Sequence, residues 1–206
     1  MSASELDFIH RYAEGATPTT LLLLHGTGGD ENDLVPLGRA VAPEAGLLSP
    51  RGQVLENGMP RFFRRLSMGV FDVEDLKSRT EDLARFIEAA GRHYGFALSD
   101  VVALGYSNGA NFAASLLFLR PTILRRAALL HAMVPFEPDH SLDLSGASVL
   151  LTGGSRDPMV PMDETERLGR LLSEAGAHLS FQLQPGGHEL TPDEVEAVRV
   201  WLLQTE

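Results

Sequence analysis

A serine flanked by two glycines lies near the middle of the chain, in the sequence GYSNG of residues 105–109. The apolar residues before it are typical of a short buried strand, and the alanine-rich residues 110–120 after it are typical of a helix. Glycines around a strand-to-helix turn let Ser107 project from a very tight bend. The pattern G-x-S-x-G in this context predicts that Ser107 is a nucleophile. A turn that needs small residues only for packing is the alternative.

A nucleophilic serine needs a histidine to accept its proton and an acid to orient that histidine. In a parallel sheet, functional side chains collect just beyond the carboxyl ends of the strands. Asp157 follows the apolar residues 149–152, and His188 follows residues 179–183, which we also predict to be a strand. The chain order of serine, aspartate and histidine is the one expected for a triad on this type of scaffold. The sequence therefore predicts a triad of Ser107, His188 and Asp157.

Each member of this triad also has a plainer interpretation. Asp157 precedes a proline and could open a turn, and His188 could be a surface loop residue. His131 competes as the histidine, and we interpret it as a structural hydrogen-bonding residue near the site. Asp163 competes as the acid, and we interpret it as the N-cap of a helix. Three residue types in the expected order and in the expected loops favour the triad.

Backbone N–H groups must face the negative charge that develops on a substrate carbonyl oxygen during such an attack. Asn108 follows the nucleophile directly and is predicted to supply one of these groups. The loop HGTGGDEND, residues 25–33, follows the first apolar strand, and its glycines allow the backbone to curl toward the site. We choose Thr27 as the second donor. A plain glycine-rich turn is the alternative for this loop.

The elements that must position these residues alternate between strand and helix. Strands are predicted at residues 21–25, 46–49, 101–104, 127–131, 149–152 and 179–183, and helices at residues 32–42, 75–95, 110–120, 163–175 and 191–203. Residues 7–15 are a candidate antiparallel edge strand. Fully apolar strands that alternate with helices predict an α/β fold with a mostly parallel central sheet and helices on both faces. The length of 206 residues suits a single domain spanning residues 1–206.

Composition excludes several classes of function and partner. A net charge of −11 argues against nucleic acid or an anionic membrane as a partner. The chain has no cysteine, which excludes a cysteine nucleophile and disulfides and fits a reducing compartment. The polar N-terminal residues do not resemble a secretory signal, and no apolar run is long enough to span a bilayer. We therefore expect a cytoplasmic protein.

Motifs for metals and nucleotides are incomplete in this chain. HGTGGD lacks the G-K-[ST] ending of a phosphate-binding loop. HELTP begins like the zinc motif H-E-x-x-H, but Pro192 stands where the second histidine must be. We expect neither a metal ion nor an organic cofactor.

Several segments resemble the phospholipase/carboxylesterase family of α/β-hydrolases, which includes acyl-protein thioesterases. These segments are LLLLHGTGGDENDL, SPRG, NGMPRFF, ALGYSNGAN, SRDPMVP and GGHEL, and they cover nearly the whole chain. The most similar subgroup is that of small bacterial carboxylesterases. The resemblance implies the α/β-hydrolase fold, the triad Ser107, Asp157 and His188, and oxyanion donors at Thr27 and Asn108. Acyl-protein thioesterases usually carry glutamine where this chain has asparagine, so their protein-deacylating activity is not carried over.

The substrate site is expected to be open, because the connection of residues 132–147 is too short for the cap domain that many α/β-hydrolases insert. Candidate apolar lining residues are Phe62, Phe63, Met133, Val134 and Met159, with core packing as the alternative for each. Four arginines cluster in this part of the sequence: Arg51, Arg61, Arg64 and Arg65. Arg51 and Arg64 are our preferred candidates to face the pocket and select esters with an anionic group. Surface ion pairs with Glu56, Asp72 or Glu74 are the alternative for these arginines.

These observations together predict a serine carboxylesterase that hydrolyses small to medium acyl esters through an acyl-enzyme intermediate. A thioesterase or a lysophospholipase-type acyl hydrolase is the alternative among enzymes. A non-catalytic binding protein with a hydrolase fold is the alternative from another class. The expected partner is a small-molecule ester, and the sequence leaves open whether the chain forms a homodimer.

Overall fold

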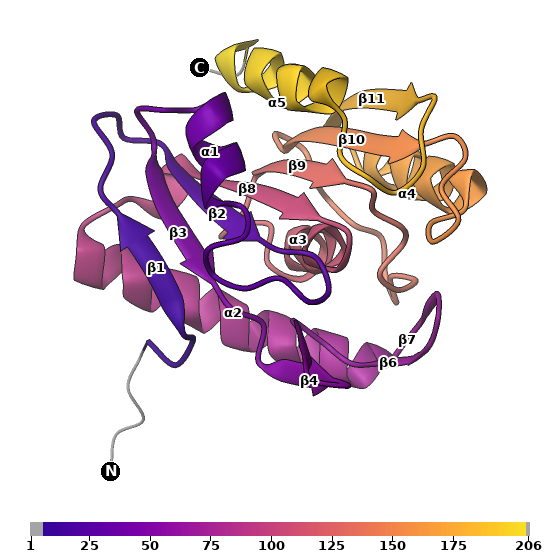
Figure 1. The fold of residues 1–206 in the computed structure, drawn as a ribbon, viewed down its shortest axis with the longest axis horizontal. Helices are drawn as coiled ribbons and strands as arrows, with labels where there is room; N and C mark the ends of the chain where they lie inside the picture. Colours follow the sequence, from indigo (N-terminus) through magenta and orange to yellow (C-terminus); the bar gives the residue numbers. More distant parts are fainter. Residues whose placement is uncertain (1–5, 205–206) are drawn as a thin grey trace.

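The computed structural model describes residues 6–204, and a seven-stranded sheet forms its centre (Figure 1). The strands run in the order β1-β3-β2-β8-β9-β10-β11. They are β1 (His10–Ala13), β2 (Thr20–Leu24), β3 (Gly46–Pro50), β8 (Val101–Tyr106), β9 (Arg126–Leu130), β10 (Ser148–Gly154) and β11 (His178–Gln184). Every neighbouring pair is parallel except β1 with β3. The predicted α/β class and the antiparallel edge strand are confirmed. Our prediction about a secretory signal falls partly on residues 1–5, which lie outside the described residues.

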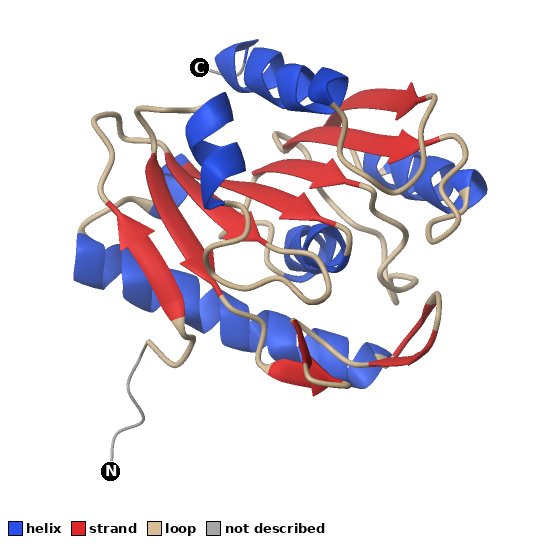
Figure 2. Ribbon diagram, in the orientation of Figure 1, coloured by secondary structure: helices blue, strands red, loops and turns tan. Residues whose placement is uncertain are grey.

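Helices cover both faces of this sheet, as Figure 2 shows in blue on red. One face carries α1 (Val35–Val41) and α5 (Pro192–Gln204), whose apolar side chains share one core cluster with alternate strand residues. The other face carries α2 (Val73–Tyr94), α3 (Asn108–Leu119) and α4 (Met162–Glu174), and a short 3₁₀ helix spans Leu98–Asp100. Because both faces are covered, the central strands are apolar on both sides, which is why they read as continuous apolar runs.

Two helix starts show how local sequence sets these boundaries. Helix α2 begins after Asp72, whose side chain accepts a hydrogen bond of 3.1 Å from the backbone N–H of Asp75. It ends at Gly95, which adopts a left-handed conformation with φ 82°. Helix α4 begins after Pro161, so Asp163 lies in the first helical turn. The prediction that Asp163 is the N-cap was therefore wrong by two positions.

Two small hairpins follow β3, in a segment for which we predicted neither a strand nor a helix. Strands β4 (Val54–Glu56) and β5 (Met59–Arg61) form the first, and β6 (Arg65–Ser67) and β7 (Val70–Phe71) form the second (Figure 1). The first hairpin turns at Asn57 and Gly58, which both have positive φ, 52° and 80°. Such a pair is the turn that joins adjacent antiparallel strands with the correct twist. Arg61 and Arg65 belong to these hairpins, and Arg64 lies in the connection between them.

The connection between β9 and β10, residues 131–147, contains no helix or strand and adds no separate cap domain to the described part of the chain. Within residues 6–204, no helix is both long and apolar enough to cross a bilayer.

Candidate active site

Ser107 occupies the bend between β8 and α3 alone. Strand β8 ends at Tyr106 and α3 begins at Asn108, and Ser107 has φ 53° and ψ −114°. A positive φ is uncommon for a residue other than glycine and marks a strained turn. The backbone N–H of Ser107 donates a hydrogen bond of 2.8 Å to the carbonyl of Leu130 on β9. This geometry lifts the serine side chain above the carboxyl edge of the sheet.

The two glycines of the G-x-S-x-G motif are required by close backbone contacts. A Cβ atom on Gly109 would lie 2.0 Å from the carbonyl oxygen of Leu24 on β2. A Cβ atom on Gly105 would lie 2.7 Å from the carbonyl oxygen of Gly109. The first turn of α3 therefore packs directly on the sheet, and this contact is the reason why the motif has glycine at both positions.

Replacing Gly109 with alanine is expected to destabilise the fold by about 3 kcal/mol, because neither backbone can move away from the added methyl group. Gly169→Ala, inside α4, is the matched control, since its Cβ would lie at an ordinary contact distance of 3.5 Å from the side chain of Leu151 on β10. That control should be neutral or stabilising by up to about 1 kcal/mol, the gain in helix propensity. Urea unfolding measures both. Similar free energies for the two variants would contradict the close packing at Gly109.

Asp157 and His188 converge on Ser107 from the loops that follow β10 and β11. Nε2 of His188 lies 2.8 Å from Oγ of Ser107, and Nδ1 lies 2.7 Å from Oδ2 of Asp157. The Asp157 carboxylate accepts a hydrogen bond from the Nδ1–H group, so Nε2 is left to accept the hydroxyl proton of Ser107. The arrangement can activate a serine hydroxyl and later return a proton to a leaving group.

The Asp157 carboxylate is almost fully buried, with 1% of its side chain exposed. Burial by itself raises the pKa of Asp157. Hydrogen bonds from His188, from the backbone N–H groups of Val160 and Met159, and from His131 outweigh that effect and lower the pKa. Asp157 therefore stays ionised and can stabilise a positive charge on His188.

His131 contacts the same carboxylate oxygen of Asp157 as His188 does, and it links Asp157 to a second buried acid. Its Nδ1 lies 2.9 Å from Oδ2 of Asp157, and its Nε2 lies 3.0 Å from Oε1 of Glu194. Burial lowers the pKa of His131, but the hydrogen bonds and charges of Glu194 and Asp157 outweigh burial and raise it. His131 therefore lies between two buried carboxylates that favour its protonated form, which fits the structural role that we expected for it.

Glu194 was not identified from the sequence. It lies in the first turn of α5, where its Oε2 accepts hydrogen bonds from the backbone N–H and hydroxyl of Thr191. This is a capping box, and the sequence TPDE carries its signature. The other carboxylate oxygen accepts a hydrogen bond of 2.7 Å from the hydroxyl of Thr152 on β10. A local capping signal therefore could have located this residue but not its contact with His131.

The raised pKa of His131 predicts a pH-dependent stability. The pKa of His131 is higher in the folded state than its ordinary 6.5. Its protonation therefore adds its full contribution to the free energy of unfolding below about pH 6.5, and this contribution disappears as the pH rises through the folded pKa. The free energy of unfolding of the wild type is therefore expected to decline above about pH 6.5. His131→Gln should remove this part of the decline, and His178→Gln, at an exposed strand position, should retain it. Urea unfolding between about pH 6 and pH 9 measures the slopes, and equal slopes in wild type and His131→Gln would refute the assignment.

His131, Asp157 and His188 also offer ligand atoms within 4.8 Å of one another, a spacing that a metal ion could use. Both imidazoles, however, direct Nδ1 at the same oxygen of Asp157. We therefore interpret the group as a hydrogen-bonded chain, and the expectation of metal-free chemistry stays a prediction.

Thr27 and Asn108, the two predicted oxyanion donors, both line the cleft beside Ser107. Among residues 6–204, neither backbone N–H has a hydrogen-bond acceptor, although the adjacent Gly28 N–H donates to the carbonyl of Pro60 at 2.9 Å. Two free N–H donors next to a nucleophile can stabilise an oxyanion. The side chain of Asn108 serves a different purpose, because its Oδ1 accepts a hydrogen bond of 2.9 Å from the backbone N–H of Phe62.

His25 fixes the loop that carries Thr27. Burial chiefly lowers the pKa of His25, so the imidazole is neutral. Its Nδ1 donates to the carbonyl of Gly26 at 2.6 Å, and its Nε2 accepts a hydrogen bond of 3.0 Å from the backbone N–H of Gly52. This histidine, which ends the sequence LLLLH, thereby connects the glycine-rich loop to the segment after β3.

Comparison with known proteins gives the chain its family. A profile of the phospholipase/carboxylesterase family matches residues 9–205. The chain belongs to this family. The Bacillus subtilis (strain 168) protein MhqD is 50% identical over 192 residues, covering 93% of this chain and 96% of MhqD. A carboxylesterase structure from Bacillus cereus is 46% identical with a TM-score of 0.93, covering 95% of this chain and 93% of that one. A carboxylesterase structure from Mesorhizobium loti is 36% identical with a TM-score of 0.86, covering 92% and 90%.

The fold is accordingly the α/β-hydrolase fold, and the chain is a member of a hydrolase family that includes carboxylesterases. In this family member the cleft beside the serine has a cavity volume of about 30 Å³. It is lined by Thr27, Arg61, Arg65, Met68, Gly69, Phe71, Ser107, Asn108, Asn111, Met133, Met159, Val160 and His188. Met133 and Met159 thus lie where the sequence placed them.

The other apolar candidates lie in the core of this family member. Phe62 and Phe63 are 1% and 0% exposed and pack against Phe112 of α3, with ring centroids 5.0 and 6.0 Å apart. Val134 is buried in the same cluster and does not line the cleft. The alternative of core packing describes these three residues.

The arginines that line the cleft are also not the two that we preferred from the sequence. Arg51 forms two hydrogen bonds with Glu31, of 2.5 and 2.8 Å, and Arg64 is 59% exposed and pairs with Asp72 at 2.9 Å. Neither arginine lines the cleft, because its guanidinium is held by a carboxylate outside it. Arg61 and Arg65 line the cleft instead.

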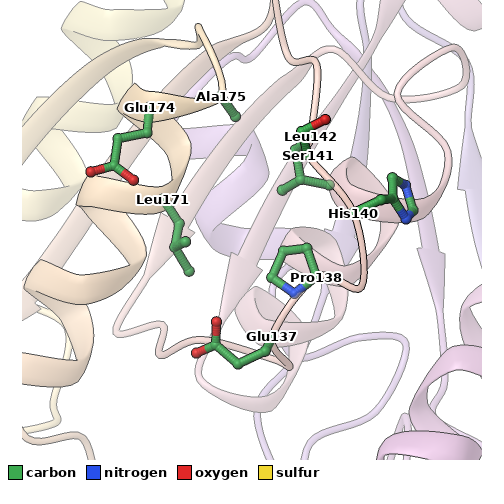
Figure 3. Close-up of a pocket in the computed structure, with 8 residues that line it drawn as sticks. All are labelled: Glu137, Pro138, His140, Ser141, Leu142, Leu171, Glu174 and Ala175. Carbon is green, nitrogen blue, oxygen red and sulfur yellow. The ribbon is translucent and has the colours of Figure 1, made fainter.

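A second hollow lies between the loop of residues 137–142 and the end of α4 (Figure 3). It is lined by Glu137, Pro138, His140, Ser141, Leu142, Leu171, Glu174 and Ala175. This hollow shares no lining residue with the cleft beside Ser107. We assign the reaction to the cleft beside Ser107, because it contains the predicted nucleophile.

Proposed function

We propose that this chain is a serine carboxylesterase that hydrolyses small to medium acyl esters through Ser107, His188 and Asp157. The hydrogen bonds of 2.8 Å from Ser107 to His188 and of 2.7 Å from His188 to Asp157 carry the proposal. Membership of a family with carboxylesterases supports the ester as substrate. The cleft is shallow, with a cavity volume of about 30 Å³. Typical ligand pockets measure roughly 300 Å³ or more, so this cleft favours small acyl groups.

Acylation begins when Oγ of Ser107 attacks the ester carbonyl carbon and Nε2 of His188 takes the hydroxyl proton. The carbonyl oxygen becomes an oxyanion, which accepts hydrogen bonds from the backbone N–H groups of Thr27 and Asn108. Asp157 stabilises the imidazolium. The tetrahedral intermediate then collapses, the bond to the alkoxy oxygen breaks, and His188 gives its proton to that oxygen. The alcohol leaves, and the acyl group stays on Ser107.

Deacylation repeats these steps with water as the nucleophile. His188 takes a proton from the water as the water oxygen attacks the acyl carbon, and the same two N–H groups hold the second oxyanion. Collapse of this intermediate breaks the bond to Oγ of Ser107, and His188 returns the proton to Oγ. The carboxylic acid leaves, and the free enzyme is restored.

A panel of p-nitrophenyl esters from acetate to palmitate, beside matched thioesters, tests the proposal. Short esters should have the highest kcat/KM, with a decline beyond about eight carbons as the chain outgrows the cleft. A consistent preference for thioesters, or for long acyl chains, would favour the thioesterase or lysophospholipase alternative. No turnover of any substrate, together with no labelling of Ser107 by a fluorophosphonate, would indicate a non-catalytic binding protein.

We also propose a cytoplasmic location and a small-molecule substrate without a nucleic-acid partner. The net charge of −11 and the absence of cysteine from the sequence support these two assignments.

A further inference from the structure

Two positively charged side chains line the cleft beside Ser107, although the chain as a whole is strongly acidic. Arg61 and Arg65 both belong to the lining, and the lining contains no aspartate or glutamate. The carboxylate nearest to both guanidinium groups is that of Glu56. It lies 3.2 Å from Nε of Arg61 and 2.9 Å from Nη2 of Arg65. One carboxylate thus compensates two guanidinium groups, which leaves an excess positive charge at the cleft.

Arg61 is held rigidly, with only 3% of its side chain exposed. Its Nη1 donates a hydrogen bond of 2.8 Å to the hydroxyl of Thr27, and its Nε lies 3.3 Å from the carbonyl of Phe63. Among residues 6–204, no acceptor binds its Nη2. Burial, followed by the charge of Arg65, lowers the pKa of Arg61. An anion placed beside these two guanidinium groups would relieve their repulsion.

Arg65 offers a second donor that is poorly matched in the free protein. Its Nε donates to Glu56 at 2.9 Å, but within the described part of the chain its Nη1 contacts only the sulfur of Met68, at 3.3 Å. A thioether is a weak acceptor, and a carboxylate would be a much stronger one. Because Arg61 contacts Thr27, the donors of Arg61 and Arg65 lie beside the loop that carries Thr27, one of the two proposed oxyanion donors.

We propose that Arg61 and Arg65 form a subsite for a carboxylate of the substrate, so that the preferred substrates are small esters that carry a carboxylate close to the scissile bond. This inference rests on the proposed esterase function, and it names the substrate class. The carboxylate would accept hydrogen bonds from Nη2 of Arg61 and Nη1 of Arg65, while the ester carbonyl faces Ser107. Planar guanidinium groups suit a carboxylate better than a lysine would.

Pairs of esters that differ only in charge test this subsite. Monomethyl succinate and methyl succinamate place a carboxylate or a neutral amide on the acyl side, and O-acetylglycolate and O-acetylglycolamide place them on the alcohol side. Hydrolysis is followed by proton NMR. In at least one pair, kcat/KM should be about tenfold or more higher for the anionic ester, the size expected for a charged hydrogen bond. Ratios of one or less in both pairs would overturn the proposal.

Variants locate the preference on the two arginines. Arg65→Gln should reduce the anionic-to-neutral ratio of kcat/KM by about tenfold. Arg61→Lys, which keeps the charge but removes the planar fork, should also reduce it. Arg64→Gln is the matched control, because Arg64 pairs with Asp72 outside the cleft, and it should keep the wild-type ratio. A ratio preserved in both Arg65→Gln and Arg61→Lys would refute the subsite.

Binding measured without turnover separates the subsite from the esterase reaction. Calorimetric titration should detect tighter binding of succinamate, an anion, than of neutral succinamide, and Arg65→Gln should weaken only the former. If no ester is hydrolysed but succinamate binds through Arg65, the esterase proposal fails and the anion subsite stands. If esters are hydrolysed and the two ligands bind equally, the subsite fails and the esterase proposal stands.

Discussion

Replacing Ser107 with alanine is expected to lower kcat for ester hydrolysis by about a millionfold, because the residual rate then comes only from the oxyanion donors and substrate binding. The fold should be unchanged, since the hydrogen bond that Oγ makes is with His188 at the cleft surface. The backbone at this position is fixed by the hydrogen bond from its N–H to Leu130 and by the glycine contacts around the turn. Turnover of p-nitrophenyl acetate and thermal unfolding measure the two effects.

Ser115→Ala is the matched control for this variant. Ser115 is fully buried in α3, and its hydroxyl lies 2.7 Å from the hydroxyl of Thr80. Its loss should cost about 1 kcal/mol of stability and leave turnover intact. A folded Ser107→Ala protein that still cleaves esters appreciably would disprove the assignment of the nucleophile. Labelling of wild type by a fluorophosphonate at a residue other than Ser107 would do the same.

The sheet could be predicted well because its strands are buried on both faces. The predicted strand of residues 101–104 appears as Val101–Tyr106, and that of residues 149–152 appears as Ser148–Gly154. Uninterrupted apolar runs between polar loops mark such strands without any knowledge of their neighbours. Because parallel strands share one carboxyl edge, the order of loops along the chain was enough to bring Asp157 and His188 together.

The hairpins were missed although a signal for the first was present. Asn57-Gly58 is the dipeptide that favours a two-residue hairpin turn, and both residues adopt positive φ. The flanking strands have three residues each and mix charged with apolar side chains, so no alternation was visible. Exposed short strands are stabilised by contacts with distant segments, here the hydrogen bond from Gly28 in the loop of Thr27 to Pro60 of β5, and that information is not local.

The choice among four arginines depended on these hairpins. In the first hairpin Val54 pairs with Arg61, and this register directs the Arg61 side chain inward to Thr27. Arg64 falls in the connection to β6 and pairs with Asp72, the cap of α2. All four residues have the same chemistry, so residue type cannot distinguish them. An error in the secondary structure of one short segment therefore became an error in the substrate site.

Replacing Asp157 with asparagine is expected to lower kcat by about ten-thousandfold, the cost measured for this change in a comparable triad. Asp163→Asn is the matched control. Asp163 lies in the first turn of α4, where a negative charge contributes only about 0.3–1 kcal/mol of helix stability, and its loss should leave turnover nearly unchanged. The opposite ranking of the two variants would show that Asp157 is not the acid of the triad.

The size of the Asp157→Asn effect follows from the donors around the carboxylate. Oδ1 accepts hydrogen bonds from the backbone N–H groups of Met159 and Val160, which cannot change their protonation. The amide nitrogen of asparagine would repel these two donors and is therefore forced to the position of Oδ2, where it faces His131 and His188. His188 can accept a hydrogen bond from the amide only by moving its proton from Nδ1 to Nε2. Nε2–H then points at Ser107 and cannot take the hydroxyl proton. Nitrogen-15 NMR of the His188 ring reports the tautomer directly, and an unchanged Nδ1–H form in an inactive Asp157→Asn protein would contradict this cause.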